Sequence, residues 1–176
     1  MSPIKSALHI RLGIVLFCLL SMTSCYTLQV PTTSNSGQLR NYPYIYIIPT
    51  SSVSGSSGVH GTQYGVYGGA TMTTNPSEVI AGYLMKKGFT ILPELTPELQ
   101  SKTLIVSYGH TGKRQLSLFA YSNIVLIQFR DAKTHSLVAS SEAEGCGDNE
   151  AQDILQAITR ALDALFNNTP QAQLLN

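Results

Sequence analysis

The sequence is poor in charge and in cysteine, and these scarcities exclude several classes of protein. Only 12% of its 176 residues are charged, with 11 Lys and Arg against 10 Asp and Glu, so the formal net charge is +1. A nucleic-acid-binding domain normally carries a basic surface, so this balance argues against a nucleic-acid partner. The hydrophobic fraction of 43% and the small net charge also exclude a chain that is disordered throughout. A small globular protein remains.

Metal-ligating residues are sparse as well, and no HExxH or CxxC motif occurs. The histidines beyond the N-terminal region, His60, His110 and His135, lie far apart in predicted loops. Metal sites need clustered ligands, so scattered surface histidines are the better interpretation. Gly68 and Gly69 precede a predicted helix, but the Lys-Ser/Thr ending of a phosphate-binding loop is missing. We therefore predict neither a metal nor a cofactor.

The N-terminal residues combine a basic start with a short apolar run. Lys5 and Arg11 precede nine largely apolar residues at positions 12–20. A helix needs about 20 apolar residues to span a bilayer, so this run is too short for a permanent membrane anchor. A basic start, a short apolar core and small polar residues after it are typical of a secretory signal. We predict a signal peptide over residues 1–24.

Cys25 stands shortly after this run, and the two residues directly before it, Thr23 and Ser24, are small. The arrangement resembles the lipobox of bacterial lipoproteins, in the looser form known from Bacteroidota. The resemblance implies cleavage before Cys25, a diacylglycerol on its thiol, and an acyl chain such as palmitate on its new amino group. The alternative is an ordinary cleaved signal with an incidental cysteine. Two or more acyl chains hold a protein firmly to a membrane, so lipid on Cys25 would make the membrane a partner.

The residues after Cys25 bear on the compartment. They include no acidic run that resembles a surface-export signal, and no Asp that resembles an inner-membrane retention signal. We therefore expect a protein anchored in the outer membrane and facing the periplasm. Cys18 would be lost with the signal and Cys25 would carry lipid, so Cys146 would stay alone and no intramolecular disulfide could form.

The remaining chain divides by composition into a tether, a domain and a tail. Residues 25–41 are polar and rich in turn formers, and we expect a flexible lipidated tether there. Residues 42–168 form the predicted domain, and 169–176 a short tail. Within the domain, residues 50–75 contain six glycines, five serines and five threonines. So few apolar side chains predict a long loop, and loops of this length are usually functional or disordered.

Local signals predict two helices and a set of strands. Asn75 as a cap, Pro76 in the first turn and Glu78 predict a helix over 76–87 that Gly88 ends. Asp148 or Asn149 caps the second helix, over 150–166. We expect His135, in the hairpin loop 131–135, to have a positive φ. Strands are expected over 44–48, 89–92, 103–108, 116–130 and 137–144, with a turn over 109–114.

The predicted order is strand, long loop, helix, four strands and helix. It indicates an α+β fold with a single mixed sheet of about five strands and two helices on one face. The helix that ends in Lys-Gly-Phe and the Arg-Asp-Ala-Lys-Thr hairpin before the closing helix resemble a recurring module of the bacterial envelope. That module occurs in the Tol protein amino-terminal domain, penicillin-binding-protein activator lipoproteins and the curli-secretion lipoprotein. The likeness covers residues 42–166 and implies docking or assembly of other envelope proteins, not chemistry.

Candidate catalytic residues are few. Cys146 lies between glycines before a helix, where a thiol could have a lowered pKa, but an incidental thiol is the better interpretation. Glu142 and Glu144 share a strand face at what looks like the exposed end of a hairpin, so we expect them to be solvated. No Gly-x-Ser-x-Gly motif is present.

Tyrosine supplies the remaining signal, because it is enriched at protein interfaces. Tyr42, Tyr44 and Tyr46 alternate along the first strand and should share one face of the sheet. Tyr64 and Tyr67 lie in the predicted loop and are the candidate partner-binding residues. We expect a non-enzymatic, lipid-anchored envelope protein that binds or scaffolds another envelope component. The alternative is an envelope hydrolase that acts on cell-wall or glycan material.

Overall fold

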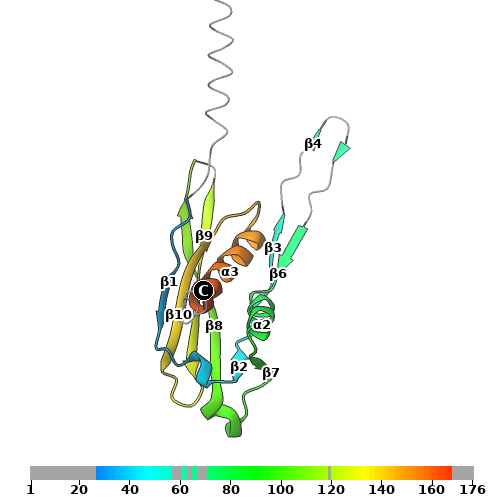
Figure 1. The fold of residues 1–176 in the computed structure, drawn as a ribbon. Helices are drawn as coiled ribbons and strands as arrows, with labels where there is room; N and C mark the ends of the chain where they lie inside the picture. The colour runs from blue at the N-terminus through cyan, green and yellow to red at the C-terminus, as the bar shows by residue number, and fades with distance from the viewer. Residues whose placement is uncertain (1–26, 57–60, 63–64, 67–70, 119, 168–176) are drawn as a thin grey trace, which may run out of the picture.

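The structure is a computed structural model, and it describes residues 27–56, 61–62, 65–66, 71–118 and 120–167 (Figure 1). The fold is α+β, as predicted, with one mixed sheet and two main helices. Its helices are α2 (Pro76–Lys86) and α3 (Glu150–Asn167), with short 3-10 helices η1 (Leu39–Asn41) and η2 (Pro97–Lys102). Its strands are β1 (Thr32–Asn35), β2 (Tyr44–Ile47), β3 (Val53–Ser56), β4 (Gly61–Thr62), β5 (Gly65–Val66), β6 (Thr71–Thr74), β7 (Thr90–Leu92), β8 (Thr103–Gln115), β9 (Tyr121–Asp131) and β10 (Leu137–Gly145).

The main sheet has six strands in the order β1-β10-β9-β8-β2-β7. β2 runs parallel to both β7 and β8, whereas β8, β9, β10 and β1 pair antiparallel. α3 packs on β9, β10 and β1, and α2 packs on β7 and on α3. Buried side chains from the sheet and both helices form the core: Ile45, Ile80, Leu84, Leu104, Val106, Val125, Ile127, Phe129, Ile154, Ile158 and Leu162.

The two helices begin where local chemistry predicts. The side-chain oxygen of Asn75 accepts a hydrogen bond from the Ser77 backbone N–H at 3.1 Å, which caps α2. Asn149 caps α3 by accepting from the Gln152 N–H at 3.1 Å. His135 has φ 59°, as expected for the β9–β10 turn. No helix in the described part of the chain is both long enough and apolar enough to cross a bilayer.

α3 lies unusually close to the end of β10. A Cβ atom built on Gly145 would stand 1.9 Å from the backbone oxygen of Asp153 in α3, so only glycine fits there. The Ser141 hydroxyl donates to the backbone oxygen of Ala161 at 2.7 Å, which fixes the helix to the strand again farther along. α3 is thus held against β10 by close backbone contact as well as by its buried apolar side chains.

Three expectations from the sequence differ from the structure. The predicted tether 25–41 contains β1, which pairs with β10, and η1, because the edge of β10 offers backbone partners to a polar segment. The predicted loop 50–75 contains the antiparallel pairs β3–β6 and β4–β5. The predicted turn 109–114 lies inside β8, and the chain reverses at 116–120 instead. The ends of the chain, 1–26 and 168–176, lie outside the described residues.

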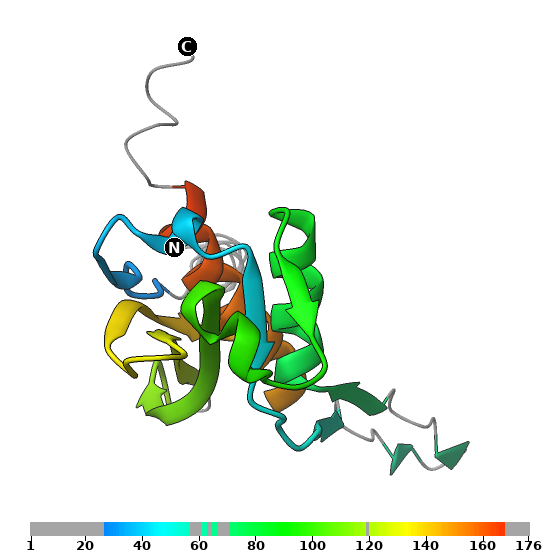
Figure 2. The ribbon, with the colours of Figure 1, turned by 90° about the horizontal axis from the view of Figure 1, so that it is seen from below.

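The pairs β3–β6 and β4–β5 form an arm that extends away from the main sheet (Figure 1, Figure 2). The base of the arm packs on the start of α3, since β3 and β6 both contact that helix. A Cβ atom on Gly55 would stand 2.6 Å from Oδ1 of Asn149, so the glycine allows this approach. Tyr64 and Tyr67, the candidate partner-binding residues, lie outside the described residues.

Candidate functional site

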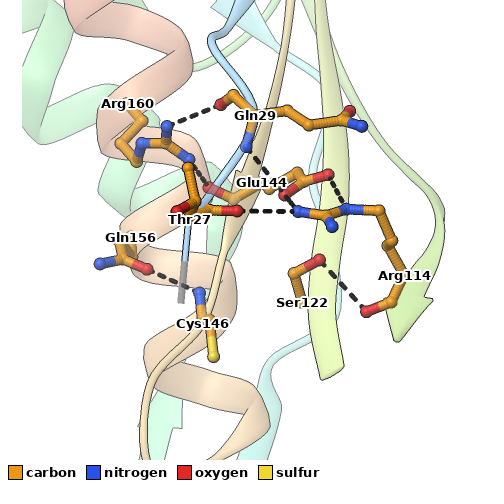
Figure 3. Close-up of polar contacts among 8 residues, drawn as sticks. All are labelled: Thr27, Gln29, Arg114, Ser122, Glu144, Cys146, Gln156 and Arg160. Carbon is orange, nitrogen blue, oxygen red and sulfur yellow. Dashed lines mark hydrogen bonds and ion pairs between the residues drawn. The ribbon is translucent and has the colours of Figure 1, made fainter. Parts of the chain in front are cut away.

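A group of polar side chains at one end of the sheet holds the first described residues of the chain (Figure 3). Glu144, near the end of β10, is only 2% exposed. Its two carboxylate oxygens accept from Nε and Nη2 of Arg114 in β8, each at 2.6 Å. The backbone N–H of Gln29 donates to the same carboxylate at 3.2 Å. The buried Glu144 carboxylate is thus paired with two donors of the Arg114 guanidinium, and it also binds the backbone of Gln29, 115 residues away in the sequence.

The N-terminal segment is held at two further points. Nη2 of Arg114 also donates to the backbone oxygen of Thr27 at 3.3 Å. Arg160 in α3 donates to the backbone oxygen of Gln29 at 2.8 Å and to the backbone oxygen of Glu144. We call Arg114, Glu144 and Arg160, with the Thr27 and Gln29 backbone that they bind, the N-terminal clamp. It joins β8, β10 and α3 to residues that begin two positions after Cys25.

The ion pair governs the protonation of the buried carboxylate. Hydrogen bonds from Arg114 lower the pKa of Glu144, and they outweigh burial, which acts in the opposite direction. Glu144 is therefore charged at neutral pH and fully engaged within the fold. The expectation that Glu144 is solvated was wrong, because residues 27–35 cover this end of β10. Glu142, on the same strand face, is half-buried.

A polar hollow lies beside the clamp, at the start of α3. It has a volume of about 290 Å³, and Asn123, Cys146 and Asp153 line it. Asp153 accepts from Nδ2 of Asn123 at 2.7 Å and from the Gly147 backbone N–H. Burial raises the pKa of Asp153. Oδ1 of Asn123, a side chain 2% exposed, has no hydrogen-bond partner among the described residues.

Cys146 lies at the rim of this hollow. Its backbone N–H donates to Oε1 of Gln156 at 2.6 Å, which fixes the backbone rather than the thiol. Burial, with a smaller contribution from the Asp153 carboxylate, raises the pKa of the Cys146 thiol. The possibility that the helix start activates this thiol is therefore not supported, because the nearby carboxylate and burial both disfavour a thiolate.

A second hollow lies at the other end of α3, with a volume of about 240 Å³. Tyr42, Phe89 and Phe166 give it aromatic walls, and Arg40 and Lys87 line it as well. The Lys87 ammonium donates to Oδ1 of Asn167 at 2.8 Å. The chemistry of these side chains suits an apolar group that carries a negative charge, but nothing in the described chain occupies it.

The other residues singled out in the sequence are not brought together. His110 lies in β8 and His135 in the β9–β10 turn, while His60 is outside the described residues. No group of three or more His, Cys, Asp or Glu side chains in the described ranges could hold a metal ion. Cys25, the predicted lipidation site, also lies outside the described part of the chain.

Two of the three tyrosines expected on one face of the first strand, Tyr44 and Tyr46, do share a face. Tyr44 and Tyr46 are half-buried on one face of β2, and Ile45 and Ile47 are buried on the other. The Tyr42 hydroxyl, just before the strand, donates to the Asp131 carboxylate at 2.8 Å. Tyr42 packs against the core and not on the face of Tyr44 and Tyr46, because it lies outside the regular strand.

Sequence reasoning missed the N-terminal clamp. Its residues come from positions 114, 144 and 160, and no short motif connects them. One local signal was available: Glu144 lies in a strand, β10, most of whose residues are buried, and it follows the apolar Ala143 directly. Even so, its pairing with Arg114 depends on the register of β8, β9 and β10, which the sequence did not define.

Comparisons with known proteins assign the chain to no family. No protein-family description matches the sequence, and no curated protein matches it significantly. One similar solved structure is the PelC dodecamer from Paraburkholderia phytofirmans, which is 11% identical, has a TM-score of 0.47 and covers 76% of this chain and 96% of that one. A single-substitution variant of that dodecamer is 13% identical, with a TM-score of 0.45 and coverages of 77% and 95%. Likenesses this distant carry no argument about function or assembly.

Proposed function

We propose that this chain is a lipid-anchored, non-enzymatic protein of the bacterial cell envelope, and that its α+β domain binds or scaffolds another envelope component. The N-terminal clamp is the observation that carries the proposal. Thr27 is bound to Arg114, and it follows Cys25 by two residues. Two extended residues span about 7 Å, so a lipid on Cys25 would hold the domain directly against the membrane. A clamp at this position makes sense for a domain that must keep a fixed place beside its anchor.

The compartment follows from the sequence around the anchor. Residues 1–24 have the features of a secretory signal, and the residues after Cys25 have neither an acidic run nor an Asp next to the cysteine. We therefore place the protein on the periplasmic face of the outer membrane. Degradation by protease added to intact cells would contradict this placement.

The anchor is tested by replacing Cys25 with Ala in cells that express the full chain. The variant should leave the membrane fraction and should lose label from a metabolic fatty acid. Cys146→Ala is the matched control, because it removes the other cysteine that would remain after signal cleavage and should change neither result. A Cys25→Ala protein that stays in the membrane pellet with unchanged fatty-acid label would refute lipid anchoring.

The partner-binding part of the proposal concerns the arm of β3–β6 and β4–β5. Its base is held on α3 through the close approach of Gly55 to Asn149, and the chain between β3 and β6 contains Tyr64 and Tyr67, the tyrosines that we propose as partner contacts. Crosslinking in native cells, followed by mass spectrometry, should identify one envelope protein that is captured. Replacing both tyrosines with Ala should weaken that capture, and replacing both with Phe should largely keep it. Equal capture by the Ala variant would show that binding lies elsewhere.

An envelope hydrolase is the second candidate, and the hollow at Asp153 is the observation that favours it. A carboxyl group with a raised pKa in a hollow is a feature of general acids. However, both oxygens of Asp153 already accept hydrogen bonds, from Asn123 and from the Gly147 N–H. Release of fragments from peptidoglycan by the purified protein, lost in Asp153→Asn, would support this candidate against the first.

A further inference from the structure

The turn between β8 and β9 has an unusual composition. Residues 116–120 are Leu, Ser, Leu, Phe and Ala, without a Gly, Pro, Asn or Asp. Gly, Pro, Asn, Asp and Ser dominate turns, because they tolerate turn geometry or hydrogen-bond to the nearby backbone, and Ser117 is the only one of these types here. Here the backbone N–H groups of Leu116 and Ser117 donate to the Ala120 oxygen at 2.8 and 3.2 Å. Backbone bonds therefore close a reversal in which Ser117 is the only polar residue.

This turn exposes apolar surface to its surroundings. Leu118 is 76% exposed, and Tyr121, the first residue of β9, is 52% exposed and also lines the polar hollow at the start of α3. The turn at the other end of β9 is more polar, since residues 132–136 are Ala, Lys, Thr, His and Ser, while Leu137 directly after it is 44% exposed. Exposed apolar residues that are gathered at one place commonly mark an interaction site. The two ends of this long strand thus differ in what they are suited to contact.

The β8–β9 turn lies at the same end of the sheet as the first described residues of the chain (Figure 1), which the N-terminal clamp holds. Gln115, the last residue of β8, pairs with Tyr121 across the hairpin. Arg114, one residue earlier, donates to the Thr27 backbone oxygen at 3.3 Å. The base of the turn and the chain's route towards Cys25 are therefore direct neighbours. Between Thr27 and Cys25 the backbone can span only about 7 Å.

We propose that the β8–β9 turn, through Leu118 and Tyr121, enters the lipid surface that holds the acyl chains of Cys25; this inference rests on the proposed lipid anchor. A bilayer within reach of Cys25 is also within reach of a turn that adjoins Thr27. An exposed Leu suits the boundary of the acyl chains, and a Tyr suits the headgroup level, where its ring is apolar and its hydroxyl is hydrated. Lipid on one residue would leave the domain free to swivel, and a second contact would fix its orientation.

The test uses the full, lipidated chain with Cys146→Ala, purified and reconstituted into vesicles of phosphatidylethanolamine and phosphatidylglycerol. One variant carries Leu118→Cys and the control carries Thr134→Cys, in the polar turn at the other end of β9. Each new thiol receives an environment-sensitive fluorophore. The label at 118 should emit at shorter wavelength, and lipid-borne spin labels should quench it at least about threefold more strongly than the label at 134. Both positions are exposed, so the labels should leave the fold intact.

The outcomes separate this inference from the proposed anchor. If the protein floats with the vesicles and carries fatty acid, but labels at 118 and 134 are quenched alike, the inference is wrong and the anchor stands. If the label at 118 is shielded from water but not quenched by lipid, and position 118 crosslinks between copies, the turn binds a second copy and the inference is again wrong. If the protein carries no fatty acid and does not float, both the anchor and the inference fail.

Discussion

Replacing Ile158 with Asp should unfold the domain. Ile158 lies near the middle of α3 and is 0% exposed. It belongs to the core cluster that α3 forms with β9 and β10, and Ile127 and Phe129 of β9 are members of the same cluster. A carboxylate at this position would lose its water and would meet mainly apolar side chains.

The expected cost can be graded by the size of the change. Ile158→Val removes one methyl group and should cost about 0.5–1.5 kcal/mol of unfolding free energy, and Ile158→Ala about 2–5 kcal/mol. An unpaired charge in such a site costs still more, unless the group is neutralised by protonation. Because whole domains are stable by only about 5–15 kcal/mol, Ile158→Asp should leave little or no folded protein.

Urea unfolding of the purified variants, followed by far-UV circular dichroism, measures these costs. Thr159→Asp is the matched control, because Thr159 is the next residue of the same helix and is exposed. The control should unfold near the midpoint of the original protein. A soluble Ile158→Asp protein with a cooperative transition at a similar midpoint would refute the packing of α3 described above.

Four further predictions address other features. Gly145→Ala should strongly lower the thermal midpoint, because its Cβ would overlap the backbone of α3, whereas an unchanged midpoint would contradict that close approach. Because the pKa of Glu144 is lowered in the fold, its charged form should stabilise the protein at neutral pH, and this contribution should be lost as the pH falls through the folded pKa. The unfolding free energy should therefore fall less steeply with decreasing pH in Glu144→Gln than in the original protein. The same pH dependence in both proteins would count against the ion pair. Iodoacetamide should modify Cys146 more slowly than a free thiol at pH 8, since burial raises its pKa, and faster modification would show an activated thiol. Replacing residues 57–70 with a two-residue Asn-Gly turn should leave the thermal midpoint nearly unchanged, because β3 and β6 at the base of the arm are kept, and a large drop would show that the replaced residues support the domain.

The parts of the fold that the sequence predicted well depend on contacts between near neighbours. Asn75 and Pro76 begin α2, and the bond that caps it joins residues two positions apart. The β9–β10 hairpin turns at His135 with the positive φ that was expected. In each case the physical cause lies within one or two turns of chain, so the sequence displays it directly.

The candidate site was predicted poorly for the opposite reason. Glu144 was expected to be solvated, and it is buried because Gln29, 115 residues away, lies over it. The reversal at 116–120 was placed too early, since its apolar residues continue the pattern of a strand and Gly109 and Gly112 imitate a turn. The closing bond between Leu116 and Ala120 leaves no signature in residue type.

By itself, the sequence determined the two main helices, the final hairpin and the α+β class, because these depend on composition, periodicity and local caps. Only the tertiary structure decided that residues 32–35 form an edge strand on β10, and that Arg114, Glu144 and Arg160 meet around the start of the described chain. Strand pairing and a buried ion pair depend on the register between segments that are far apart in sequence. The order of residues along the sequence does not show that register, because the register is set only when the strands pair.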